Sequence, residues 1–272
     1  MKSILILIIA LTFTAPMLAR AAPQPELWPR WQAFDANSKV KVDHSAWDDF
    51  LGLYLVTKHP SGINRVRYAA VTSEDKKALE DYLERLQGTA LSTLNHQEQK
   101  AFWINLYNAL TVRIIIDHYP VKSIRDIDIS PGWFSNGPWD AKLLTIEGEK
   151  LSLNDIEHRI LRPIWQDNRV HYAVNCASLG CPNLQIKPFT ADNLEALLDQ
   201  AASDYINHPR GMKVEGDKAI LSSIYDWFQV DFGSIEEGVR QHLLKYAGAE
   251  RTEYLKTGKV HFFYDYDWAL NE

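Results

Sequence analysis

Residues 101–112 read Ala101-Phe102-Trp103-Ile104-Asn105-Leu106-Tyr107-Asn108-Ala109-Leu110-Thr111-Val112. On a helix of about 3.6 residues per turn, these apolar side chains cover nearly the whole circumference. We therefore expect a helix that is buried at the centre of the molecule. It should span about 96–118, with Ser92 or Asn95 as its N-cap and Pro120 just beyond its end.

Two amides interrupt this apolar helix. Asn105 and Asn108 are three residues apart and therefore share a face. A buried amide that finds no partner costs about 1–3 kcal/mol, so both must be hydrogen-bonded. Two interpretations are open: both clamp the backbone of a neighbouring loop, or one of them orients a catalytic imidazole or donates to an oxyanion.

The flanking segments mix helices and hairpins without a regular βαβ order. Periodicity and turn residues predict helices at 45–54, 73–86, 190–207 and 234–247, hairpins at 141–153 and 212–221, and strands at 64–71, 170–174 and 260–268. The last strand is expected to lie inside the sheet. These elements predict the α+β class: a single globular domain with a buried central helix, several helices and antiparallel hairpins.

The first residues have the pattern of a secretory signal peptide. Lys2 precedes an apolar run that continues to about Leu18, and Ala19-Arg20-Ala21 is a small-residue cleavage site. We expect residues 1–21 to be removed on export, with the periplasm as the destination. Residues 22–44 then form a leader that packs on a domain at 45–272, and no later segment is long and apolar enough to cross a bilayer.

Composition limits the partners. The formal net charge is −6, which argues against nucleic acid, because phosphate binding needs a basic surface. The hydrophobic content of 46%, with 9 Trp, supports a sizeable core. The expected partner is a small molecule, a peptide or a protein, and no pattern indicates a cofactor.

Both cysteines follow the apolar run at 170–174. Gly180 and Pro182 predict a turn between and after them. Cys176 and Cys181 are five residues apart, so an exported protein could join them in a small disulfide. Alternatively, a strand end beside a tight loop displays Cys176 as a nucleophile.

A second helix carries further candidates. Ser152 and Asp155 have the spacing of a capping box. With an α-helical rotation, Glu157 lies about 40° from the centre of the buried stripe and His158 about 140° away. Glu157 should therefore be partly buried, and His158 should lie at the shoulder. A buried carboxylate needs a cation or donors, so Glu157 either pairs with an arginine from elsewhere or serves in catalysis.

Three functions remain open. In the first, Cys176 is the nucleophile of a hydrolase or acyltransferase, His158 is its base, and Glu157, Asn105 or Asn108 orients the imidazole. The second is a non-catalytic binding module that uses the Trp-rich loop 131–139.

The third function, which we favour least, is a zinc site. Its ligands would be His158, His171, Cys176 and Cys181, whose types suit zinc although their spacing matches no standard finger. A redox role is also disfavoured, because four residues separate the cysteines instead of the two of a Cys-x2-Cys motif.

Several motifs occur together along the chain: Phe102–Leu110, Leu153–Arg162, Tyr172–Ser178, Cys181-Pro182, Tyr225–Phe228 and Tyr266–Asn271. In combination, over residues 45–271, they resemble the domain of unknown function 547 family. The resemblance implies no settled reaction. It also implies that the position of Cys176 is the constant cysteine of the family, whereas serine can replace Cys181, which favours Cys176 alone as the site residue.

Overall fold

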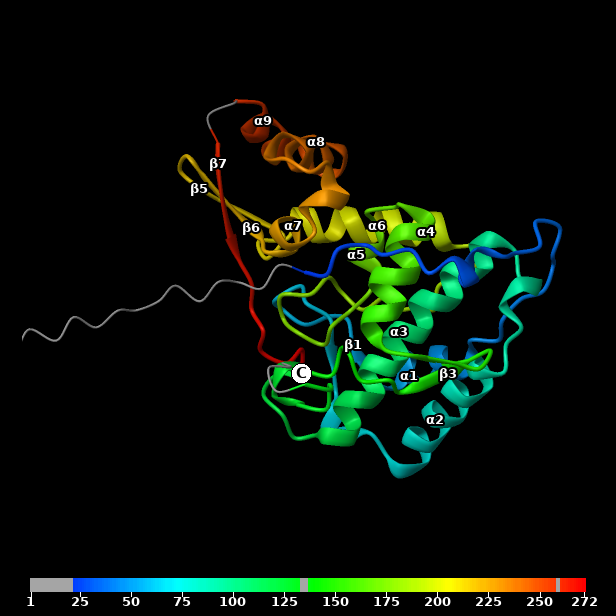
Figure 1. The fold of residues 1–272 in the computed structure, drawn as a ribbon. Coiled ribbons are helices and arrows are strands. Elements are labelled where there is room, and N and C mark those ends of the chain that lie inside the picture. Colours follow the sequence, from blue (N-terminus) through cyan, green and yellow to red (C-terminus); the bar gives the residue numbers. More distant parts are fainter. Residues whose placement is uncertain (1–21, 133–136, 258–259) are drawn as a thin grey trace, which may run out of the picture.

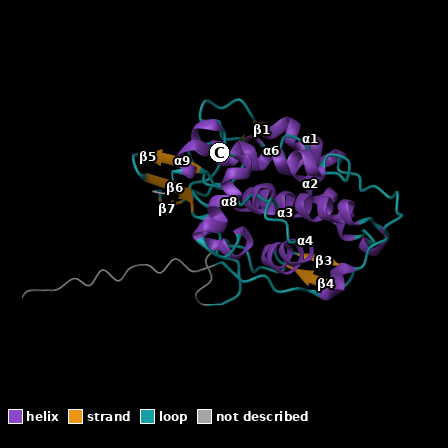
Figure 2. Ribbon diagram, turned by 90° about the horizontal axis from the view of Figure 1, so that it is seen from above, coloured by secondary structure: helices purple, strands orange, loops and turns teal. Residues whose placement is uncertain are grey.

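Helix α3 (His96–His118) runs through the middle of the molecule (Figures 1 and 2). The computed structural model describes residues 22–132, 137–257 and 260–272, so the predicted signal peptide lies outside the described residues. Every residue of α3 from Glu98 to Val112 is buried. The Asn95 side chain caps the helix by accepting the Glu98 N–H at 2.9 Å. The predicted position, burial and N-cap of the central helix are confirmed.

Two layers cover α3 on opposite sides (Figure 2). Helices α1 (Ser45–Tyr54) and α2 (Ser73–Gln87) lie on one side, where α2 contacts both α1 and α3. The other side carries the π-helix η5 (Asp155–Leu161), which continues into α4 (Arg162–Trp165). The large apolar core joins these layers because α3 is apolar on nearly all its faces.

A second, smaller core lies beyond the first. It is enclosed by α6 (Leu194–Asn207), α8 (Glu236–Tyr246), α9 (Ala249–Lys256) and a three-stranded sheet. The sheet order is β5 (Met212–Glu215), β6 (Lys218–Ser222), β7 (His261–Asp265), with β5 and β6 antiparallel and β6 and β7 parallel. Strand β7 is therefore an edge strand, and the expectation that it lies inside the sheet is wrong.

The other elements are short. They are η1 (Pro29–Gln32), β1 (Leu55–Val56), β2 (Arg65–Val66), η2 (Tyr68–Ala70), η3 (Leu91–Thr93), η4 (Ile124–Asp126), β3 (Leu144–Ile146), β4 (Glu149–Leu151), α5 (Val170–Ala173), α7 (Ile224–Trp227) and η6 (Gln229–Phe232). The hairpins β3–β4 and β5–β6 confirm their predictions, and the mixture of helices with small sheets confirms the α+β class.

Two predicted strands are wrong or too long. Residues 170–173 form the helical turn α5, closed by the hydrogen bond from Val174 N–H to the Val170 carbonyl at 3.1 Å. Every residue of this turn is buried, and a short apolar run that is buried all round does not distinguish a strand from a helix. Of the strand predicted at 64–71, only β2 is extended and paired.

Residues 22–44 run along the π-helix and the end of α3. The backbone N–H of Trp28 donates to the Arg159 carbonyl at 3.0 Å. The Trp31 ring is buried and packs edge-on against Trp103, with 5.3 Å between ring centroids. In the part of the chain that the structure describes, no helix combines the length and apolar character needed to cross a bilayer.

Candidate functional site

The two cysteines meet in the loop that follows α5. Their Sγ atoms are 2.6 Å apart, and neither cysteine is in a disulfide. A disulfide bond is about 2.05 Å long, so the sulfurs are in contact without being bonded. Cys181 is buried, whereas Cys176 is partly exposed. The structural disulfide considered from the sequence is not formed, and Cys176 is the more accessible thiol.

The local backbone explains why cysteines five residues apart can touch. Ala177 adopts a left-handed conformation with a φ of 57°, which reverses the chain directly after Cys176. The Cys181 N–H then donates to the Ser178 carbonyl at 3.2 Å. The Asn175 amide closes the loop, because it donates to the Pro182 carbonyl at 2.7 Å and accepts the Ala177 N–H at 2.8 Å.

The two amides of α3 clamp backbone segments. Asn108 donates to the Ala173 carbonyl at 2.9 Å and accepts the Asn175 N–H at 2.8 Å. Asn105 makes the same pair of bonds with Phe189, at 2.7 and 3.0 Å. Both amides therefore use their donor and acceptor on backbone groups, and in the described structure neither hydrogen-bonds an imidazole. Asn108 holds the segment that leads into Cys176.

We predict that Asn108→Ala lowers the free energy of unfolding by about 1–3 kcal/mol for each backbone group left unpaired. The thiol loop should also loosen, so that iodoacetamide labels Cys181 faster than in the wild type. Asn105→Ala is the matched control: it removes the same kind of clamp elsewhere and should cost similar stability without faster labelling. Equal labelling rates in the two variants would contradict the assignment of Asn108 to the thiol loop.

The C-terminal residues close over the thiol loop. The N–H groups of Leu179 and Gly180 donate to the carbonyls of Ala269 and Asp267, both at 2.8 Å. A Cβ atom on Gly180 would lie 2.9 Å from the Asp267 backbone, so this close approach requires glycine. The same chain segment brings Tyr266 to the thiols.

Two hydroxyl groups face the more accessible sulfur. The Tyr266 Oη is 3.1 Å from the Cys176 Sγ, and the Ser178 Oγ is 3.2 Å from it. The Ser178 hydroxyl also donates to Tyr266 at 3.0 Å. With Ser178 donating to it, the Tyr266 hydroxyl can donate its own hydrogen bond to negative charge that develops beside the Cys176 sulfur.

The two thiols have pKa values that are shifted in opposite directions. Burial opposes ionisation of Cys181, but hydrogen bonds from the Cys176 thiol, the Tyr266 hydroxyl and the Cys176 backbone N–H (2.9 Å) outweigh it and lower the pKa of Cys181 to about 7. Burial raises the pKa of Cys176, and the neighbouring Cys181 raises it further. The negative charge therefore belongs on Cys181, and the proton on Cys176.

His158 is buried and turned toward an arginine. Its Nδ1 is 3.0 Å from the Arg162 Nη1, and Arg162 is always a donor, so this nitrogen accepts. Burial, together with the charge of Arg162, lowers the pKa of His158 to about 3. Among the described residues, no hydrogen bond joins His158 to Cys176. The expectation of a shoulder position is wrong because residues 155–161 form a π-helix, whose rotation per residue is smaller than that of an α-helix.

Glu157 is buried, as the sequence pattern indicates. Its Oε2 accepts the Tyr107 hydroxyl at 3.2 Å, and its Oε1 lies 3.7 Å from the His171 Nδ1. Burial raises the pKa of Glu157 to about 7; Arg162 and Tyr107 oppose the shift, and the charge of Cys181 adds to it. Glu157 is therefore the predicted site residue with an electrostatic link to the thiol pair.

Asp231 joins the charged groups of this region. Its Oδ2 accepts from the Arg162 Nε at 2.6 Å and lies 2.7 Å from the His171 Nε2. We call Glu157, His158, Arg162, His171 and Asp231 the ionic cluster. The sequence analysis missed Arg162, Asp231, Tyr107 and Tyr266. Arg162 left a local signal, since it follows His158 by four residues on a segment with helical pattern. Tyr107 and Tyr266 lie within motifs quoted for the resemblance but were not singled out.

The proposed zinc ligands do not assemble. His158 and His171 belong to the ionic cluster, whereas Cys176 and Cys181 contact each other and hydroxyl groups. Within residues 22–132, 137–257 and 260–272, no group of three or more His, Cys, Asp or Glu side chains is arranged to hold a metal ion.

A group of aromatic rings adjoins the thiols. Tyr266 and Trp268 have ring centroids 4.7 Å apart, Trp227 packs on both, and Trp139 meets Trp268 edge-on at 5.9 Å. All four rings are partly exposed, and we call them the aromatic cluster. Trp139 ends the predicted Trp-rich loop, of which residues 133–136 lie outside the described residues.

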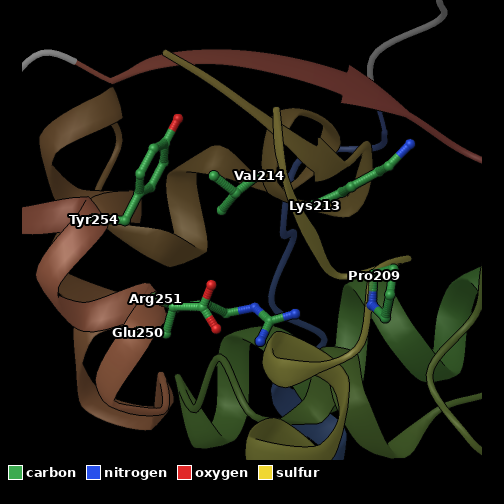
Figure 3. A pocket seen from close by; sticks show the side chains of 6 residues that line it. All are labelled: Pro209, Lys213, Val214, Glu250, Arg251 and Tyr254. Atoms are coloured by element: carbon green, nitrogen blue, oxygen red, sulfur yellow. The ribbon is translucent and has the colours of Figure 1, made fainter. Parts of the chain in front are cut away.

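A pocket of about 290 Å³ lies between α9 and β5 (Figure 3). Its lining residues are Pro209, Lys213, Val214, Glu250, Arg251 and Tyr254. Arg251 is tied to the Met212 carbonyl, with its Nε at 3.4 Å. None of the six residues hydrogen-bonds a cysteine, and we assign the pocket no role.

The fold and the thiol loop define an α+β protein in which a buried helix supports a pair of free cysteines. The model of the family described as Protein of unknown function, DUF547, matches residues 91–206, so this part of the chain is similar to that family. This confirms the resemblance over a shorter span than 45–271: α3, the π-helix and both cysteines are matched, and Asp231 and Tyr266 lie outside. A comparison with curated proteins found no match, and neither did a comparison with solved structures.

Proposed function

We propose that this protein is a cysteine-dependent hydrolase or acyltransferase with Cys176 as its nucleophile. The supporting observation is the 2.6 Å contact between the partly exposed Cys176 and the buried Cys181. In this proposal Cys181 replaces His158 as the proton acceptor. The unsettled description of the family neither requires nor opposes such a reaction.

The reaction starts with attack of the Cys176 sulfur on a substrate carbonyl carbon. The Cys176 proton passes to the Cys181 thiolate, and a base with a pKa near 7 is well suited to neutral pH. The Tyr266 hydroxyl is placed to donate to the oxyanion, and the Ser178 hydroxyl donates to Tyr266 in turn. Cys181 then returns the proton to the leaving group, and a thioester remains on Cys176 for water or an acceptor to cleave.

The aromatic cluster suits the substrate side of this proposal. Tyr266 belongs both to the cluster and to the surroundings of the Cys176 sulfur. Partly exposed rings bind apolar or aromatic groups well. The proposed substrate is therefore an ester, thioester or amide, of a small molecule or a peptide, with an apolar group beside its carbonyl. Export to the periplasm is part of the proposal.

The test is acylation by p-nitrophenyl acetate followed by intact mass spectrometry. We expect the wild type to release nitrophenol in a burst and to gain one acetyl group on Cys176, because only this sulfur is accessible to the ester. Cys176→Ala should abolish both signals. Cys181→Ser should slow the burst by about 100-fold or more, within the range for loss of general base catalysis, and remove its dependence on a group with a pKa near 7. An unchanged burst in Cys176→Ala would refute the proposal.

The second candidate is a non-catalytic binding module. The specific observation in its favour is that all four rings of the aromatic cluster are partly exposed. A ligand that quenches tryptophan fluorescence equally in the wild type and in Cys176→Ala, without acylating either protein, would support this candidate over the enzyme.

A further inference from the structure

We infer that Cys176 and Cys181 also act as a redox dithiol, which reduces a disulfide-bonded substrate and closes a reversible disulfide between the two cysteines. This activity goes beyond acyl transfer and needs no carbonyl substrate. It depends on the arrangement of the two sulfur atoms, which a lone nucleophilic thiol would not require.

The loop holds the sulfurs ready for bond formation. Their separation of 2.6 Å must shorten by only about 0.5 Å to reach the length of a disulfide. The left-handed Ala177 and the Asn175 clamp hold the turn in this shape. The Cys-x4-Cys spacing argued against redox chemistry in the sequence. The turn nevertheless brings the two sulfurs into contact in spite of this longer spacing.

The two thiols have the unequal exposure that an exchange reaction needs. Cys176 is partly exposed and can reach a substrate sulfur, whereas Cys181 is buried directly behind it. Cys181 can therefore attack the Cys176 sulfur and little else. The Cys176 N–H, 2.9 Å from the Cys181 sulfur, favours the thiolate that makes this second attack.

The exchange balances in two steps. The Cys176 sulfur attacks one sulfur of the substrate disulfide, the substrate S–S bond breaks, and one substrate thiolate leaves. The Cys181 thiolate then attacks Cys176 in the mixed disulfide and expels the second substrate thiolate. The pair loses two electrons and the substrate disulfide gains them. The Cys176 proton passes to one leaving thiolate, and the other substrate sulfur leaves as a thiolate because Cys181 starts deprotonated.

The neighbourhood also favours a negatively charged sulfur. Arg210 lies close enough that the charge of Cys181 acts on its pKa, and its guanidinium donates to the Leu179 carbonyl, within the thiol loop, at 3.1 Å. A cation beside a thiol stabilises the thiolate. Arg210 is therefore a positioning residue of the pair, since it contacts the loop backbone and acts on the sulfur electrostatically.

The test is to incubate reduced wild-type protein with oxidised glutathione, or in a second arm with insulin, and to measure intact mass after alkylation. We expect the wild type to lose two hydrogen atoms and to accept no alkyl group. Cys181→Ser should instead retain one glutathione as a stable mixed disulfide. Cys176→Ser should keep its buried thiol and form no adduct. Reaction with glutathione identifies a low-molecular-weight disulfide as the substrate, and reaction with insulin alone identifies a protein disulfide.

A wild type that keeps two alkylatable thiols in both arms, or that stops at the mixed disulfide, would overturn the inference. These outcomes are independent of the acylation burst. A protein that closes the disulfide but shows no burst retains the redox activity and loses the hydrolase. A protein with a Cys176-dependent burst and no disulfide retains only the hydrolase.

Discussion

Replacing Arg162 by methionine is expected to lower the free energy of unfolding by about 3–5 kcal/mol, because it breaks a buried ion pair. The Arg162 side chain is only 2% exposed. It donates to the Asp231 carboxylate and to the Pro23 carbonyl, both at 2.6 Å. Methionine fills much of the same space, so the loss should come mainly from leaving the Asp231 charge without its cation. Urea denaturation of the two proteins at neutral pH measures the difference.

Lys187→Met is the matched control. Lys187 pairs with Asp48 at 3.0 Å, but the lysine side chain is 62% exposed. An exposed pair contributes about 0–1 kcal/mol, so this variant should unfold nearly like the wild type. A similar small loss in Arg162→Met would show that Asp231 is stable without its partner, and that the ionic cluster does not stabilise the fold as we argue.

Glu157→Gln is expected to become more stable relative to the wild type as the pH rises. Burial raises the pKa of Glu157 from 4.5 to about 7 in the folded protein. The folded state therefore binds this proton more tightly than the unfolded state does. The resulting stability is fully present below pH 4.5 and is lost as the pH passes through about 7. The shift corresponds to a loss of about 3 kcal/mol, which the neutral amide does not suffer.

Urea denaturation of both proteins at pH 5 and pH 8 measures this change. Glu84→Gln, which replaces an exposed carboxylate on α2, is the control and should follow the wild type at both pH values. A constant difference between the wild type and Glu157→Gln across this range would mean that Glu157 ionises normally. Its predicted electrostatic link to the thiol pair would then fail as well.

Local sequence patterns predicted the elements whose structure depends on residues close together in the chain. The unbroken apolar run of α3 and its Asn95 cap required only the helical period and the preference of asparagine for an N-cap. The two hairpins followed from alternation and turn residues. The strand predicted where α5 lies was wrong, because four consecutive buried residues are compatible with a helix and with a strand.

The site was less predictable, because contacts between distant residues build it. Cys176 was identified by its place in a tight loop. Its contact with Cys181, however, depends on the left-handed backbone of Ala177. Glycine or asparagine at this position would have indicated such a conformation, but alanine does not. His158 was assigned as a base from an α-helical rotation that the π-helix does not follow. Tyr266 and Asp231 come from 90 and 60 residues beyond Cys176 and His171 respectively, and no local pattern links them.

The contacts between the thiol loop and the last residues bear on how the protein should be produced. A recombinant fragment limited to the matched span 91–206 would omit Tyr266 and the carbonyls of Asp267 and Ala269, leaving the loop amides without acceptors. An affinity tag after Glu272 would adjoin a carboxylate that already accepts the Tyr119 hydroxyl at 2.6 Å. Assays therefore belong on protein that retains its final strand and tail.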